Sequence, residues 1–186
     1  RLTVFSGSFT RQAAAEVTGA SLTALIDLVD KSFLRRPKVS RFALHELLKQ
    51  FGREKLHENA DDWNETCLKH ARYYAAYLVD QVGQAQAATQ LTEVQAVFDD
   101  IQAAWRWAVS NKYRDEIHAF SRSLLNYYNL DGWFRAGYGA VEQYQQARLC
   151  FDEEPSEPGT VATLIAIYES LGNLYEYYRE YAQALA

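Results

Sequence analysis

The sequence predicts a mainly helical protein in two parts, a winged-helix module at residues 1–58 and antiparallel helical hairpins at residues 59–186. Three observations lead to this fold class. Apolar residues recur at helical spacing over most of the chain, and only residues 33–44 show the pattern of strands. The composition, 48% hydrophobic and 23% charged, is typical of a globular protein, so a packed core is expected.

The first part begins with short helices. Leu2 to Phe5 resembles the end of a helix, and Thr10 is expected to cap a helix at residues 11–17 that stops at Gly19. Ser21 is expected to cap the next helix. Its apolar residues recur at helical spacing and are Leu22, Leu25, Ile26, Val29 and Phe33.

A strand pattern follows. Residues 33–36 and 41–44 predict two short strands joined by a basic turn at residues 37–40. A helix is expected from Glu46 to about Glu58, with an apolar face made of Leu47, Leu48, Phe51 and Leu56. The predicted order is therefore three helices, a β-hairpin and a further helix, which is the order of a winged-helix module.

From about residue 59 the sequence predicts helices only. One stripe of residues that share a face comprises Trp63, Cys67, His70, Ala71, Tyr74 and Leu78. Thr92 and Gln95 form a capping box that predicts a helix start before the apolar positions up to Ala108. Two later stripes comprise Ile117, Phe120, Leu124, Leu125 and Tyr128, and then Phe134, Tyr138, Val141 and Tyr144. Serial antiparallel hairpins satisfy such a pattern.

The last segment has the spacing of a tetratricopeptide repeat. The matching residues are Tyr168, Leu171, Gly172, Tyr175, Tyr181 and Ala184. We expect two paired helices here, with Gly172 at their closest approach and Ala186 inside the second helix. The hairpins as a whole are then expected to form a tetratricopeptide-like superhelix whose last repeat is truncated.

Composition and charge restrict the functional class. No apolar run is long enough to span a membrane, and no signal peptide is visible at the start. The two cysteines are far apart, so we expect free thiols in a cytoplasmic protein. The chain starts at Arg1 and contains no Met, and we expect it to be part of a longer parent. Residues 1–58 carry a net charge of +4 and the remainder −9, which suggests modules with different partners.

Four blocks, in this order, are similar to a known family. They are residues 4–10, 25–34 and 41–48, followed by residues 93–108, which end in Ala-Ala-Trp-Arg-Trp-Ala. The first three resemble the winged-helix part of the STAND signalling ATPases of the NB-ARC type, whose relatives include bacterial transcription activators and plant disease-resistance proteins. The fourth resembles the start of the repeat region in the bacterial members.

The resemblance implies a role for His45. In the family a Met-His-Asp triplet ends the last strand, and its histidine contacts the β-phosphate of ADP; the matching triplet here is Leu44-His45-Glu46. The start of a helix favours an anion, which agrees with such a contact. The resemblance therefore implies ADP or ATP in the parent and an upstream nucleotide-binding domain as the partner of this module.

The chain itself lacks the motif that binds nucleotide phosphates. None of its nine glycines precedes a Lys, so no phosphate-binding loop is present and we expect no enzyme activity and no cofactor in this chain. Cys67 and His70 share a helix face, but a zinc site needs three or four ligands, so packing in the core is favoured. We interpret the chain as a regulatory and protein-interaction segment. The winged helix would contribute to ADP-dependent autoinhibition, and the repeats would bind a protein or small-molecule effector.

Two sets of residues are candidates for an interaction surface: the hairpin cations Arg35, Arg36, Lys38 and Arg41, and the helical aromatics Tyr127, Trp133 and Tyr178. The alternative is a winged-helix DNA-binding protein with a helical dimerisation or effector domain. The basic hairpin would then meet phosphates. DNA is disfavoured because the candidate recognition helix, residues 22–32, carries Asp27 and Asp30 and is otherwise mostly apolar.

Overall fold

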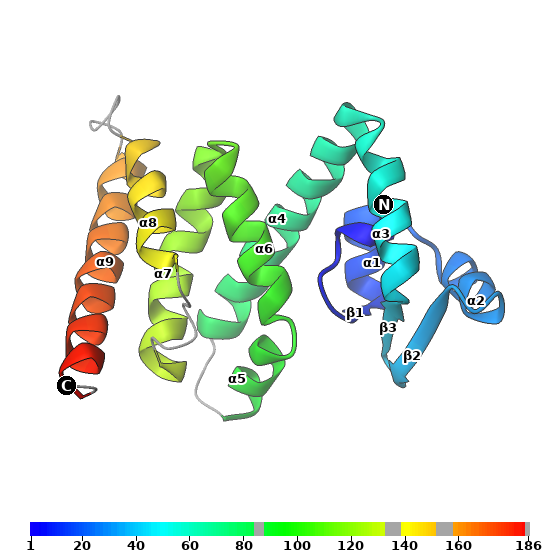
Figure 1. The fold of residues 1–186 in the computed structure, drawn as a ribbon, viewed down its shortest axis with the longest axis horizontal. Coiled ribbons are helices and arrows are strands. Elements are labelled where there is room, and N and C mark those ends of the chain that lie inside the picture. The colour runs from blue at the N-terminus through cyan, green and yellow to red at the C-terminus, as the bar shows by residue number, and fades with distance from the viewer. Residues whose placement is uncertain (84–87, 133–138, 152–157, 185–186) are drawn as a thin grey trace. The chain divides into compact units, whose positions relative to one another are not determined.

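The computed structural model describes residues 1–83, 88–132, 139–151 and 158–184. The fold is mainly α-helical, with one small three-stranded antiparallel sheet among the N-terminal helices (Figure 1). Internal contacts divide the chain into two compact units. The first comprises Arg1–Tyr74 and Gln95–Ala104, and the second comprises Ala75–Val94 and Trp105–Ala186.

The first unit opens with local elements that the sequence predicts well. Strand β1 (Phe9–Thr10) leads into α1 (Arg11–Thr18), where the Thr10 side chain accepts a hydrogen bond from the Ala13 amide at 3.1 Å. Helix α1 ends at Gly19, whose φ of 72° is the left-handed conformation that favours glycine. The Ser21 side chain caps α2 (Leu22–Asp30) in the same way. Residues Leu2–Val4, which we expected to be the end of a helix, form a single 3₁₀ turn.

The sheet confirms the predicted hairpin and adds a strand to it. Strands β2 (Leu34–Lys38) and β3 (Arg41–Leu44) are antiparallel, and Leu34 lies opposite Leu44. Strand β1 pairs with the other edge of β3, so the order is β1-β3-β2 (Figure 1). A strand of two residues is too short to show an alternating pattern, so β1 was not predicted. This arrangement is consistent with a winged-helix-like start to the chain.

Helix α3 (Glu46–His57) follows β3 directly, as predicted. Only part of its expected apolar face is covered, however. Leu56 is buried, but the side chain of Leu47 is 72% exposed and that of Phe51 is 58% exposed. Lys55 Nζ lies 6.0 Å from the centroid of the Phe51 ring, and both apolar side chains remain more than half exposed.

The core of the first unit draws in residues beyond the predicted module of residues 1–58. The rings of Phe5 and Phe9 stack with centroids 4.4 Å apart, and the His70 ring meets Phe5 at 5.5 Å. His70 belongs to α4 (Ala60–Gly83), and Asp100 of α6 (Phe98–Ser110) binds the backbone near Phe5. The compact unit therefore extends to Tyr74 and includes residues 95–104.

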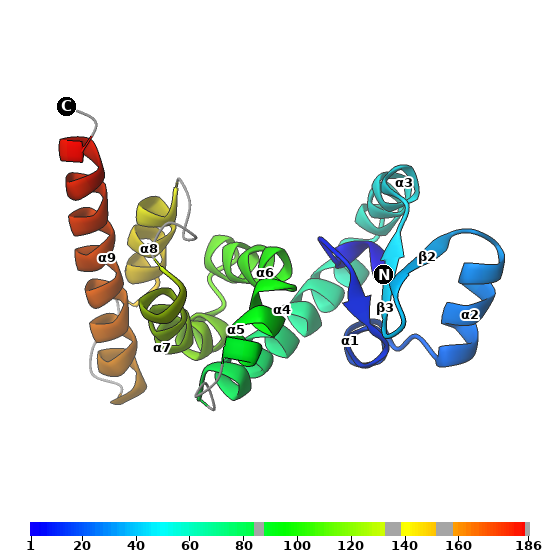
Figure 2. The same ribbon diagram turned by 90° about the horizontal axis from the view of Figure 1, so that it is seen from below.

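The second unit is built from helices. Within it, α5 (Ala88–Gln95) precedes α7 (Arg114–Asp131), α8 (Ala140–Leu149) and α9 (Pro158–Ala184), and α9 packs along both α7 and α8 (Figure 2). The Trp105 ring lies 6.2 Å from Phe120 and 5.2 Å from Tyr144 between ring centroids. The predicted stripe from Ile117 to Tyr128 is buried, as expected. Phe134 and Tyr138 of the next predicted stripe lie outside the described residues.

The predicted helix start at Thr92 is wrong. Thr92 lies inside α5, the chain turns at residues 96–97, and α6 begins at Phe98. The buried side chains of Val97 and Phe98 fix this turn, and two acidic residues in the first turn of α6, Asp99 and Asp100, complement the positive end of its dipole.

The predicted tetratricopeptide hairpin at residues 168–184 is also wrong. This segment lies in one continuous helix, α9, and Tyr168 and Tyr175 are 54% and 53% exposed rather than buried in a groove between two helices. A Cβ placed on Gly172 would meet nothing within 4 Å. The physical reason is that residues 173–184 contain no glycine or proline, so no residue interrupts the helix.

Gly172→Ala should therefore raise the free energy of unfolding by up to about 1 kcal/mol, because alanine is the better helix former and the space is open. Gly52→Ala is the contrasting variant. Its Cβ would lie 2.6 Å from Cγ2 of buried Thr3, and we expect a net loss of about 1 kcal/mol from overpacking. Urea unfolding followed by circular dichroism measures both. A destabilised Gly172→Ala variant would instead indicate the close helix approach of a tetratricopeptide hairpin.

Candidate functional site

His45 lies at the junction of β3 and α3. It is the N-cap residue of α3, with φ −67° and ψ 138°, and its exposed side chain makes no capping hydrogen bond. Its imidazole is thus accessible beside the free amides that begin a helix, the position at which anions bind. Leu47 and Phe51 follow one helical turn apart and are both exposed. We refer to these two side chains as the α3 face.

The hairpin cations divide into exposed and buried residues. Arg35, Arg36 and Lys38 on β2 are exposed, and none of them forms an ion pair within the described part of the chain. Arg36 has a fixed position, because its guanidinium donates to the Val39 carbonyl and lies 5.7 Å from the centroid of the Phe42 ring.

Arg41 does not belong to this surface, contrary to our expectation. It is 7% exposed, and its guanidinium donates to the Ser8 hydroxyl at 2.9 Å, to the Ser8 carbonyl and to the Ala96 carbonyl at 3.4 Å. These three acceptors offset the cost of burying the charge. Arg41 is buried because β1 pairs beside it, with Thr10 opposite, and the sequence did not reveal that strand.

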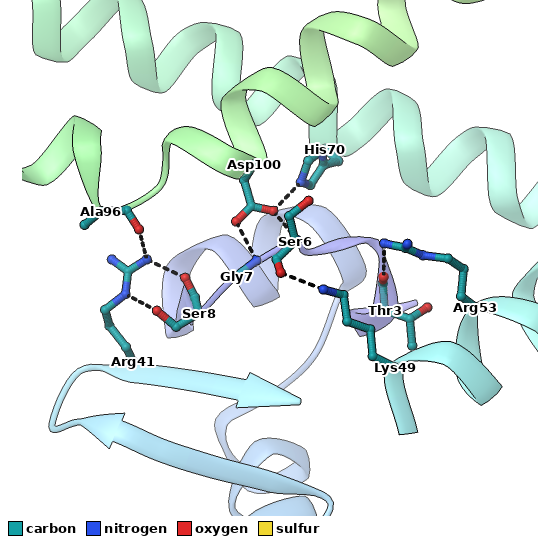
Figure 3. Close-up of polar contacts among 10 residues, drawn as sticks. All are labelled: Thr3, Ser6, Gly7, Ser8, Arg41, Lys49, Arg53, His70, Ala96 and Asp100. Atoms are coloured by element: carbon teal, nitrogen blue, oxygen red, sulfur yellow. Dashed lines mark hydrogen bonds and ion pairs between the residues drawn. The ribbon is translucent and has the colours of Figure 1, made fainter. Parts of the chain in front are cut away.

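A buried carboxylate, Asp100, is the centre of a polar network in the first unit (Figure 3). Asp100 is 1% exposed and accepts hydrogen bonds from the Ser6 amide at 2.6 Å and the Gly7 amide at 3.3 Å. His70, 3% exposed, places Nε2 at 3.2 Å from Asp100 Oδ1. Because an ionised carboxylate only accepts, the proton of this bond belongs to His70 Nε2.

Residues 3–8, which we call the N-terminal segment, are also held by cations (Figure 3). Lys49 Nζ donates to the Ser6 carbonyl at 2.6 Å, and Arg53 donates to the Thr3 carbonyl at 3.2 Å. With Arg41 and Asp100, side chains from β3, α3, α4 and α6 fix a segment that has almost no regular structure of its own. Sequence reasoning missed this network. The one available signal was that Asp100 lies at helical spacing from Val97 and Ala104, on an apolar face.

The chemistry of this region is structural. Burial raises the pKa of the Cys67 thiol to about 12, even though the nearby Arg53 favours the thiolate, so Cys67 is protonated at neutral pH and is a poor nucleophile. In the residues that the structure describes, no three His, Cys, Asp or Glu side chains are grouped so as to hold a metal ion. No helix among them is both long and apolar enough to cross a membrane.

The second unit has an open groove between α7 and α9. Its volume is about 820 Å³, and its lining includes the ion pair Arg122–Glu169, at 3.0 Å, and the amides Asn126 and Asn173. The lining therefore combines both charges with neutral hydrogen-bonding groups, which suits a peptide or a small polar effector better than a purely apolar ligand.

The predicted aromatic residues contribute little to that groove. Tyr127 is fully buried and its hydroxyl donates to Asp131 at 2.7 Å, so its assignment to an interaction surface was wrong. Tyr127 is buried because this face of α7 is turned into the helical core. Tyr178 is half-buried with its ring centroid 5.5 Å from that of Tyr177. Trp133 lies outside the described residues.

The comparisons with known proteins give no family. No protein-family model, no curated protein and no solved structure matches this chain. Function is therefore inferred from the fold and from the side chains described above.

Asp100→Ala should lower the free energy of unfolding by about 3 kcal/mol, because it leaves the buried His70 imidazole and two partly buried backbone amides without their acceptor. Asp99→Ala is the matched control. Asp99 is the neighbouring carboxylate in the first turn of α6, but it is exposed, so we expect a loss below about 1 kcal/mol. Chemical denaturation measures both variants. Equal losses would show that the first turn of the helix, and not the network, needs the negative charge.

Proposed function

We propose that this chain is a non-catalytic regulatory and protein-interaction segment of a STAND-type, NB-ARC-like signalling ATPase. The first unit acts as a winged-helix module that docks on the nucleotide-binding domain of the parent and helps to retain ADP. The second unit binds a protein or small-molecule effector. The observation that carries this proposal is the exposed His45 at the start of α3, followed by the exposed α3 face.

The α3 face supports docking. A Phe and a Leu that are more than half exposed on one side of a helix form an apolar patch that water solvates poorly. Burying each of them against another domain contributes roughly 1.5–3 kcal/mol. In the same unit Val17 of α1 and Phe42 of β3 are buried, so the exposure of Leu47 and Phe51 is not a general property of its apolar residues.

His45 supports a phosphate contact within that docked arrangement. Its side chain makes no capping hydrogen bond to its own helix, so a ring N–H is available to an anion. The amides of the first turn of α3 and the dipole of the helix add positive potential. Glu46, whose side chain is 84% exposed and is directed away from the core, opposes an anion electrostatically, so the contact depends on the orientation of this acid toward solvent.

The second unit supports effector binding through its packing. Helices α7, α8 and α9 form a helical stack with an accessible groove between α7 and α9. We propose that this stack continues a tetratricopeptide-like superhelix, although α9 itself is one helix. The two cysteines are both free thiols, which agrees with a cytoplasmic protein.

The alternative is a winged-helix DNA-binding protein, and the exposed Arg35, Arg36 and Lys38 favour it. Helix α2 argues against it. Asp27 and Asp30 are exposed on this candidate recognition helix, and Ile26 beside them is 46% exposed. Acidic and aliphatic side chains lack the donors that read base edges and that bind phosphates.

In the parent protein, His45→Ala should accelerate the release of labelled ADP about tenfold to a hundredfold, because a hydrogen bond to a charged group contributes roughly 1.5–3 kcal/mol. Stopped-flow fluorescence measures the release. His57→Ala is the control, since His57 lies at the other end of α3 and contacts Trp63, with ring centroids 3.8 Å apart. Release that is unchanged in the His45 variant would contradict the phosphate contact.

A further inference from the structure

A second surface of the first unit is separate from the α3 face. A groove of about 550 Å³ lies among α1, α2 and the β2–β3 hairpin, and we call it the hairpin groove. Its apolar lining comes from Ala15, Leu22, Val39 and Phe42. This volume is in the range of ligand sites in proteins and is enough for several side chains. None of its lining residues belongs to α3.

The apolar side chains at this groove are unusually accessible. Val39, in the turn between β2 and β3, is 88% exposed, although turns ordinarily carry polar residues or glycine. Leu22 is 38% exposed and Ile26, one helical turn further along α2, is 46% exposed. The apolar lining of the groove therefore continues along the accessible side of α2. A contiguous apolar surface of this kind marks an interaction site.

Two cations, Arg11 and Arg36, line this groove, and two more, Arg35 and Lys38, are exposed on the same hairpin. None of these cations forms an ion pair in the part of the chain that the structure describes. The surface thus combines an apolar floor with unpaired cations.

Arg36 is arranged to receive a carboxylate. One of its N–H groups donates to the Val39 carbonyl, and its guanidinium lies 5.7 Å from the centroid of the Phe42 ring. A guanidinium has five N–H donors in a planar fork, so donors remain after this bond is made. Because the side chain already has a fixed position, a bidentate bond to a carboxylate costs little additional ordering.

We propose that the hairpin groove is a docking site for an acidic segment of a partner protein that presents aliphatic side chains on one face. The carboxylates of this segment pair with Arg36 and its neighbouring cations, and its aliphatic side chains contact Leu22, Val39 and Phe42. Nucleic acid fits less well, because phosphates would pair with the cations but leave the apolar floor uncovered. This inference does not depend on the phosphate contact of His45.

The test uses fluorescence anisotropy on the intact chain with a labelled peptide of about 16 residues, roughly four helical turns. Leu occupies the positions that would lie on one face of a helix, and Glu or Asp occupies the others. The comparison ligands are the same peptide with Ser in place of every Leu, and a labelled DNA duplex. We expect the Leu-containing acidic peptide to bind at least about tenfold more tightly than either comparison ligand at physiological salt.

Three variants locate the binding. Arg36→Glu should lower the affinity for the peptide about tenfold, because it reverses a charge. Val39→Ser should lower the affinity about threefold, because it removes an apolar contact. Arg106→Glu is the control, because Arg106 is exposed on α6 in the second unit and its replacement changes the net charge equally. The Arg106→Glu variant should bind the peptide with the same affinity as the unaltered chain. Val39 is 88% exposed, so its variant folds and stays informative if charge reversal disturbs the hairpin.

Each of the following outcomes would overturn the proposal. Equal binding of the Ser peptide would show general charge attraction with no apolar site. Tighter binding of the duplex, lost in Arg36→Glu, would make the hairpin a nucleic-acid surface. An unchanged affinity in Val39→Ser, or an affinity lowered equally by Arg106→Glu, would place the peptide elsewhere, and no measurable binding would exclude the docking site.

Discussion

The buried carboxylate of Asp100 is the interaction on which the first unit depends. Removing a carboxylate from water costs several kcal/mol, and this cost is offset only if donors surround it. The donors here are the Ser6 and Gly7 amides and the His70 imidazole. The carbonyls of the same segment are bound in turn by Lys49, Arg53 and Arg41. A segment with almost no regular structure is thereby fixed, and the rings of Phe5 and Phe9 enter the core.

This fixed core makes the accessible apolar side chains informative. A unit that buries Phe5, Phe9 and Leu25 almost completely still leaves Phe51 and Val39 in water. Such exposure weakens no internal contact, but it favours association, because covering these side chains releases the water around them. The α3 face and the hairpin groove are therefore the surfaces through which we propose that this unit acts. Its buried polar groups serve packing, and the raised pKa of Cys67 agrees with that role.

Local signals predicted the parts of the fold that local forces decide. Thr10 and Ser21 each cap a helix because the cap is a bond to an amide three residues away. Longer-range features were missed. Strand β1 exists only through its pairing with β3, and the turn before α6 depends on the burial of Val97 and Phe98. In α9 the spacing of a tetratricopeptide repeat was present, but spacing alone does not create a turn where no residue interrupts the helix.

The sequence by itself determined the helical character of this protein, its hairpin and the exposed basic residues Arg35, Arg36 and Lys38, because periodicity and turn chemistry are local properties. The tertiary structure decided which side chains meet solvent. Arg41 and Tyr127 were expected at the surface and are buried, while Leu47 and Phe51 were expected in the core and are exposed. Periodicity shows that a helix or strand has two faces, but which face is covered depends on neighbours that are distant in the sequence.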